Sequence, residues 1–143
     1  MQQLAELLGD ESVVRVGGTP SSGKSTLAEL LEEHLDDGQN VSVVLVDNWD
    51  HGVRPLSVLL PACGTNVYGL KNTSNLVIIV DEGQHTYVDS YLWYGVIKAA
   101  SGAVKGTRWC IFSSYGSPTT GAPNPVIPRQ LHHQFYPTKS AFP

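Results

Sequence analysis

The stretch of sequence that decides the fold reads Gly18-Thr19-Pro20-Ser21-Ser22-Gly23-Lys24-Ser25-Thr26. It fits the pattern G-x-x-x-x-G-K-S/T of a phosphate-binding loop, in which glycines let successive backbone N–H groups point at one anion. Lys24 would then place its charge on the β- and γ-phosphates of a nucleotide, and the Ser25 hydroxyl would bind Mg²⁺. The predicted phosphate-binding residues are Gly18, Ser21, Ser22, Gly23, Lys24, Ser25 and Thr26.

The segments on either side of this loop agree with the motif. Residues 12–16 form a short β-branched run, which predicts a strand that leads into the loop. Residues 24–37 predict an amphipathic helix that follows it, because leucines recur at helical spacing and acidic residues lie mostly on the other face. A strand, the loop and a helix in this order are the context that the motif requires. The sequence therefore predicts a nucleotide-binding loop.

A second motif follows an unbroken apolar run at residues 76–80, Leu-Val-Ile-Ile-Val. Such a run is typical of a central parallel strand that is covered on both faces. Asp81 and Glu82 come directly after it, at the carboxyl end of the strand, where ligands of open α/β sheets bind. We expect Asp81 to hold Mg²⁺ through water, as a Walker B aspartate does, and Glu82 to orient or deprotonate an attacking water. Ser25 and Asp81 are thus the predicted metal-binding residues.

The order of the predicted elements indicates an α/β fold. Strands are expected at 12–16, 41–46, 76–80 and 108–112, and helices at 1–8, 24–37, 55–62 and 87–100. Strands that alternate with helices favour a short, mostly parallel sheet with helices on both faces, the three-layer sandwich of P-loop NTPases. Residues 64–75 are rich in turn formers and are expected to be a connection. A full sheet of this class usually has at least five strands, so either the end of the chain packs irregularly on the sheet or the domain is cut short.

The last part of the chain, residues 115–143, differs from the rest. It contains six of the nine prolines and no Asp or Glu. Proline removes a backbone donor and blocks helices and central strands. We therefore divide the chain into a core at 1–114 and a proline-rich tail at 115–143. Because soluble proteins cover an unpaired sheet edge, we expect the tail to lie extended across that edge or to reach a second chain and form a dimer.

The composition limits the class of protein. Hydrophobic residues make up 41% of the 143 residues and charged residues 15%, as in one globular domain. No apolar run approaches the ~20 residues that a membrane span needs, and the amino terminus lacks the features of a signal peptide. We expect no membrane partner and an intracellular location, cytoplasmic or nuclear.

The net charge of −4 is unevenly distributed along the chain. Residues 1–89 contain all 13 acidic residues and four of the nine Lys and Arg, whereas residues 90–143 contain the other five and no acid. Nucleic acid is bound by clustered cations. Five dispersed cations give little support to a nucleic-acid partner.

Several other polar residues are candidates for roles at the phosphates. Ser113 and Ser114 follow the fourth predicted strand, where ATPases with an added strand between the P-loop and Walker B strands carry a polar γ-phosphate sensor; otherwise these hydroxyls face water. Gln84 could also reach the phosphate. The candidate arginine fingers are Arg54, Arg108 and Arg129, of which Arg108 is the poorest because it begins a strand. The loop acids Asp47 and Asp50 and the pair His132-His133 are more simply read as solvated or partner-facing than as ligands.

Four segments together resemble the P-loop ATPase domain of Crinkler-type proteins, which are host-directed effectors or conflict toxins of filamentous eukaryotic microbes. The segments are 18–26, Val80-Asp81-Glu82-Gly83-Gln84, Leu92-Trp93 with Ile97-Lys98, and Ile111-Phe112-Ser113-Ser114-Tyr115-Gly116-Ser117-Pro118. The resemblance spans roughly residues 12–122. The family typically joins this core to a nuclease-like or other effector domain and precedes it with a header domain that directs transport.

Carried over by residue, the resemblance implies that Lys24 and Ser25 bind phosphate and Mg²⁺. It implies that Asp81 and Glu82 are the Walker B pair and that Ser113 or Ser114, of which we favour Ser114, is the sensor. Gly83 departs from the family, where a small residue such as Ala is usual.

Three functions are compatible with these motifs. The first is Mg²⁺-dependent ATP hydrolysis by an additional-strand P-loop domain, with Lys24, Glu82 and Ser114 as the catalytic residues. An alternative is a nucleotide-responsive interaction module with little turnover that signals through its tail. The other alternative is a small-molecule kinase, although residues 115–143 contain one arginine where a kinase needs an arginine-rich lid. ATP is preferred over GTP because no Asn-Lys-x-Asp signature occurs.

Overall fold

The computed structural model of the protein describes residues 2–18, 23–36, 40–50, 52–101, 106–114 and 134–135. In chain order its elements are α1 (Gln2–Asp10), β1 (Val13–Gly18), α2 (Lys24–Asp36), β2 (Ser42–Val46), α3 (Pro55–Cys63), α4 (Val67–Asn72), β3 (Leu76–Val80), the 3₁₀ helix η1 (Gly83–Thr86), the π-helix η2 (Tyr91–Ile97), α5 (Lys98–Ser101), β4 (Arg108–Ser114) and β5 (Gln134–Phe135). The predicted α/β class is confirmed.

The strands form one sheet in the order β2-β3-β4-β1-β5, and every described pair is parallel. Strand β4 lies between β1, which leads into the phosphate-loop motif, and β3, which leads into Asp81. In the register of these pairs, Val16 lies beside Phe112 and Ile79 lies beside Cys110. The ends of β1, β4 and β3 therefore meet at one edge of the sheet.

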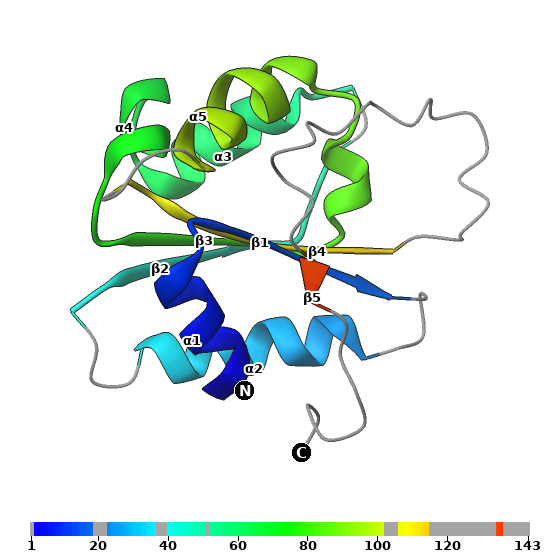
Figure 1. Ribbon diagram of the computed structural model, residues 1–143. Helices are drawn as coiled ribbons and strands as arrows, with labels where there is room; N and C mark the ends of the chain where they lie inside the picture. Colours follow the sequence, from blue (N-terminus) through cyan, green and yellow to red (C-terminus); the bar gives the residue numbers. More distant parts are fainter. Residues whose placement is uncertain are drawn as a thin grey trace.

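Helices cover both faces of the sheet (Figure 1). The short α1 and the longer α2 lie on one face, and α3, α4 and α5 lie on the other. Alternate residues of the strands are buried against these two layers, as the pleat of a sheet requires. One core cluster contains Leu4, Leu8, Val14, Val16, Leu27, Ala28, Leu31, Val77, Ile79, Cys110 and Phe112. The second includes Leu56, Leu59, Leu70, Ile78, Val80, Leu92, Trp93, Trp109 and Ile111.

The connection predicted at 64–75 contains a helix, α4, and that prediction is wrong. Its turn formers act as caps. Gly64 adopts φ 63° at the end of α3, and the Asn66 side chain accepts a hydrogen bond of 2.9 Å from Gly69 N at the start of α4. The helix predicted at 87–100 is also different, because the chain first makes η1 and then a π-helical turn, η2, before α5.

Strand β4 continues beyond the predicted end at residue 112. Gly17 pairs with Ser113 and Gly18 pairs with Ser114, so the two serines belong to the strand and do not follow it. The added pairing with β1 gives their backbone groups partners that a turn would lack.

Two residues of the predicted tail join the sheet at the open side of β1. Arg15 pairs with Gln134, and Val16 pairs with Phe135, both in parallel. This short piece lies where an extended tail was predicted to cover the sheet edge. The rest of 115–143 lies outside the described residues, and a dimer through the tail stays a prediction. Among the described residues, no helix is long and apolar enough to cross a membrane.

Candidate functional site

The phosphate-loop motif connects β1 to α2 at the carboxyl edge of the sheet. Gly23 adopts φ 82°, a left-handed conformation that favours glycine. Its carbonyl then accepts a hydrogen bond of 3.0 Å from Leu27 N, which begins the ladder of α2. The predicted phosphate contacts of Ser21 and Ser22 lie outside the described residues. The amino end of α2 is a favourable place for an anion, because its first N–H groups have no partner within the helix.

Lys24 and Ser25, at the first turn of α2, face the acidic pair that follows β3. Lys24 is only 5% exposed. Burial lowers the pKa of Lys24, although the nearby carboxylates of Glu82 and Asp81 act in the opposite direction. The Ser25 side chain is hydrogen bonded to the Asp81 carboxylate. The structure thus brings together the two predicted metal-binding residues, Ser25 and Asp81, and sets the predicted phosphate-binding lysine beside them.

Asp81 is buried, and this burial raises its pKa. Hydrogen bonds from the Ser25 side chain and from the backbone N–H of Glu82, the latter 2.9 Å long, act in the opposite direction. The carboxylates of Glu82 and Asp47 add to the rise of the Asp81 pKa. A cation placed here would relieve this crowding of negative charge.

The oxygen atoms that this site offers as metal ligands fit Mg²⁺. In the described part of the chain, no group of three or more His, Cys, Asp or Glu side chains could hold a metal by itself. Mg²⁺ prefers oxygen ligands and usually binds one or two protein groups together with water and substrate phosphates. The Ser25 hydroxyl and the Asp81 carboxylate are ligands of that kind, so they suit an ion that arrives with a nucleotide.

Glu82 has an unusual backbone. Its φ is 54°, and among the described residues it is the only non-glycine with a positive φ. Such strain persists where the surroundings determine the conformation, and it is frequent at functional sites. The Glu82 side chain is 43% exposed, and its Oε2 atom lies 2.6 Å from Gln84 Nε2 and 4.0 Å from His85 Nε2. The predicted base is therefore open to solvent on one side and held on the other.

Gly83 lies where the segment after β3 passes very close to β4. A Cβ atom at Gly83 would lie 2.7 Å from Ile111 Cγ2 and 3.1 Å from the Phe112 carbonyl oxygen. An alanine would therefore force the two segments apart. This close approach gives a physical reason for glycine at position 83.

The two serines at the end of β4 differ in their surroundings. Ser113 is 2% exposed, and its Oγ accepts a hydrogen bond of 3.1 Å from the Tyr87 hydroxyl. The alternative in which both hydroxyls face water is therefore wrong for Ser113. Ser114 is half-buried, and its backbone N–H donates to Gln84 Oε1 at 3.0 Å. Ser114 lies beside Gly18 in the register of the sheet, next to the start of the loop motif.

Trp49 supports the site and was not identified from the sequence. It follows β2, and its indole Nε1 donates a hydrogen bond of 2.7 Å to the Asp81 carbonyl oxygen. This contact fixes the peptide that carries the predicted Mg²⁺ ligand. The only signal in the sequence was the position of Trp49 after a strand that ends at the same edge.

The candidate arginine fingers are placed differently from one another. Arg108 Nη1 donates to the carbonyl oxygens of Leu8 and Glu11, at 2.6 and 3.2 Å, which ties α1 to the amino end of β4. Its position away from the phosphate-loop end of the sheet was predicted correctly. Arg129 and the pair His132-His133 lie outside the described residues. Arg54 lines a pocket.

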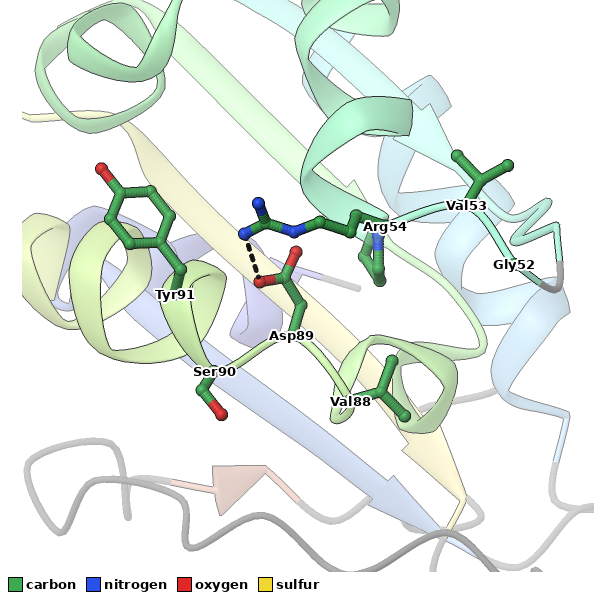
Figure 2. A pocket seen from close by; sticks show the side chains of 8 residues that line it. Gly52, Val53, Arg54, Val88, Asp89, Ser90 and Tyr91 are labelled. Atoms are coloured by element: carbon green, nitrogen blue, oxygen red, sulfur yellow. Dashed lines mark hydrogen bonds and ion pairs between the residues drawn. The ribbon is translucent and has the colours of Figure 1, made fainter.

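This pocket lies between the start of α3 and the start of η2 and has a volume of about 460 Å³. Figure 2 shows Arg54 reaching across it to Asp89, with the Tyr91 ring on the other side. Arg54 Nη2 lies 3.1 Å from Asp89 Oδ1, and its guanidinium carbon lies 6.0 Å from the Tyr91 ring centroid. Asp89 is buried and also accepts hydrogen bonds of 3.1 Å from Leu56 N and Leu92 N. It therefore caps two helices at once.

Comparison with other proteins gives no further assignment. The sequence matches none of the family models with which it was compared, and it matches none of the curated proteins. The function is therefore inferred from the geometry of the site.

Proposed function

We propose that this chain binds ATP with Mg²⁺ and hydrolyses it. One observation carries the proposal: the Ser25 side chain is hydrogen bonded to Asp81, although 56 positions separate the two residues. The carboxylates of Glu82 and Asp81 lie close enough to Lys24 to act on its pKa. A lysine, a hydroxyl and two carboxylates at the mouth of a helix are the side chains that phosphoryl transfer to water requires.

Each residue has a distinct part in the proposed reaction. The N–H groups at the start of α2 and the Lys24 ammonium would bind the β- and γ-phosphates. The bound Mg²⁺ ion would neutralise charge on the phosphate oxygens, and Ser25 and Asp81 would hold it, Asp81 through water. Glu82 would accept a proton from the attacking water. The oxygen of this water forms a bond to the γ-phosphorus while the bond between the γ-phosphorus and the bridging oxygen of ADP breaks. The products are ADP and inorganic phosphate.

The arrangement of the sheet also supports this proposal. Strand β4 lies between β1 and β3, and it ends in Ser113 and Ser114 beside the loop motif. This is the strand order expected of an additional-strand P-loop domain, and we propose that class for the chain. Within that class, the Crinkler-type ATPase domain is the family that its motifs resemble. Ser114 is the proposed γ-phosphate sensor.

A second candidate is transfer of the phosphoryl group to a small molecule. It is favoured by the pocket of about 460 Å³ beside Arg54. Residues 52–55, which follow β2, and residues 88–91, which follow β3, line this pocket. The Arg54 side chain is 61% exposed while Asp89 holds it, so its remaining N–H groups can meet an anionic acceptor.

Phosphate release from ATP by the purified chain with Mg²⁺ tests the proposal. Glu82→Gln keeps the shape of the side chain but removes the proton acceptor, so turnover should fall by roughly a hundredfold or more while ATP still binds. Glu29→Gln, at an exposed position of α2, is the matched control and should keep the parental rate. Equal turnover in Glu82→Gln would refute the role of Glu82. ADP formation that appears only when an acceptor is added, without free phosphate, would favour the kinase.

A further inference from the structure

Gln84 makes two hydrogen bonds with its side-chain amide, one at each end. Its Nε2 donates to Glu82 Oε2 at 2.6 Å, and its Oε1 accepts from Ser114 N at 3.0 Å. A carboxylate can only accept and a backbone N–H can only donate, so the two partners permit one orientation of the amide. The sequence suggested that Gln84 could reach the phosphate, but in the structure both ends of the amide are engaged by protein.

The segment that carries Gln84 is itself fixed. Thr86 Oγ1 donates to the Gly83 carbonyl oxygen at 2.6 Å, and Trp93 Nε1 donates to Thr86 Oγ1 at 3.1 Å. The Tyr87 ring packs edge-on against Trp93 with a centroid separation of 5.4 Å. Since η1 is thus tied to η2, the Gln84 amide is held by its backbone as well as by its partners.

We propose that Gln84 is a positioning residue for Glu82 and links this predicted base to the end of β4. The inference rests on the proposed function. The amide N–H occupies Glu82 Oε2, which leaves Oε1 to accept a proton from water. The same hydrogen bond holds the Glu82 carboxylate in one orientation.

The other end of the amide gives this contact a second consequence. Ser114 N is bound to Gln84, and Ser114 lies beside Gly18, the first residue of the loop motif. The path from the loop to the base therefore runs from Gly18 through Ser114 and Gln84 to Glu82.

Two variants separate the two ends of the amide. Gln84→Met keeps the length of the side chain and removes both hydrogen bonds. Gln84→Glu keeps an acceptor for Ser114 N but sets a carboxylate against Glu82. Asn40→Met is the control, because it also replaces an amide by a thioether, at an exposed position that precedes β2 at the opposite edge of the sheet.

The first measurement is the hydrogen exchange of the Ser114 backbone amide, followed by NMR in the nucleotide-free protein. Exchange should be faster in Gln84→Met, because the acceptor of this N–H is lost, and should stay close to the parental rate in Gln84→Glu, which keeps an acceptor. It should not change in Asn40→Met. An unchanged exchange rate of Ser114 N–H in Gln84→Met would overturn the inference, whether or not the chain hydrolyses ATP.

The second measurement is steady-state ATP hydrolysis. In Gln84→Met we expect kcat to fall about tenfold or more, the size of one lost hydrogen bond to a charged group, with KM unchanged. In Gln84→Glu we also expect kcat to fall with KM unchanged, although the contact with Ser114 N is kept. Parallel losses in kcat, KM and melting temperature would indicate a merely structural role and overturn the inference. A parental chain that releases no phosphate would refute the proposed function, while faster exchange of Ser114 N–H in Gln84→Met would still support the contact.

Discussion

We expect the Asp89 side chain to contribute strongly to the free energy of unfolding, although it is not one of the proposed catalytic residues. Its carboxylate is 2% exposed and accepts hydrogen bonds of 3.1 Å from Leu56 N and Leu92 N, as well as from Arg54. In Asp89→Ala, two buried N–H groups at helix starts lose their acceptor, at a cost of about 1–2 kcal/mol each. The Arg54 pair adds at most about 1 kcal/mol, because Arg54 is 61% exposed and solvent screens it. We expect a total loss of about 2–5 kcal/mol in the free energy of unfolding.

Urea unfolding followed by circular dichroism measures this loss. Asp89→Asn should cost about half as much, because the amide keeps one oxygen and turns an N–H₂ group toward the other donor. Glu29→Ala removes a carboxylate from an exposed helical position and should change the free energy by less than about 0.5 kcal/mol. A loss below about 0.5 kcal/mol for Asp89→Ala would refute the reasoning that this side chain caps both helices.

Three further predictions follow from the close packing and the charges of the site. Gly83→Ala should lower the melting temperature in a thermal scan, because its Cβ would lie 2.7 Å from Ile111 Cγ2; an unchanged melting temperature would show that the segment can shift freely. Mg²⁺-dependent ATP binding should weaken, as pH is lowered, at a higher pH than an ordinary aspartate pKa of about 3.9 would give, because the pKa of Asp81 is raised and its protonated form cannot bind the ion. The same titration on Asp81→Asn should lose this pH dependence. Trp49→Phe should weaken Mg²⁺-dependent binding more than nucleotide binding without the ion, since it removes the hydrogen bond to the Asp81 carbonyl; equal effects in calorimetry would contradict that role.

The parts of the fold with strong local patterns were predictable from the sequence. The strand at 76–80 was predicted with the same bounds as β3, because five consecutive apolar residues leave little choice. The helix predicted at 24–37 corresponds to α2, Lys24–Asp36. The helix α4 was missed because Gly64 and Asn66, which predict turns, serve here as caps.

Other features depend on residues that are distant in sequence. No periodicity of the sequence predicts the π-helix η2. Its start is fixed by Asp89, whose carboxylate also accepts a hydrogen bond from Leu56 N on α3. The pairing of Gln134–Phe135 with β1 covers too few residues to give a pattern. Such contacts are decided by tertiary packing, which local propensity does not describe.

The candidate site also contains contacts that the sequence predicts and contacts that it does not. The proximity of Ser25 and Asp81 could be expected, because each follows a strand whose carboxyl end lies at the same edge. The contacts of Trp49 and Gln84 could not, since each joins the ends of two different strands. Gln84 illustrates the limit: its spacing from Glu82 suggested a phosphate ligand, whereas the end of β4 supplies its second partner.

The central claim is that the loop before α2 binds a nucleotide, and the most direct measurement is the affinity of the chain for a fluorescent ATP analogue with Mg²⁺. Lys24→Ala removes the charge at the proposed β- and γ-phosphate site, where a charge-assisted contact contributes about 1.5–3 kcal/mol. The affinity should therefore fall roughly tenfold to a hundredfold. Lys71→Ala, on α4, removes the same charge away from the loop and should bind as the parental chain does. Equal affinity in the parental chain and Lys24→Ala would contradict the claim.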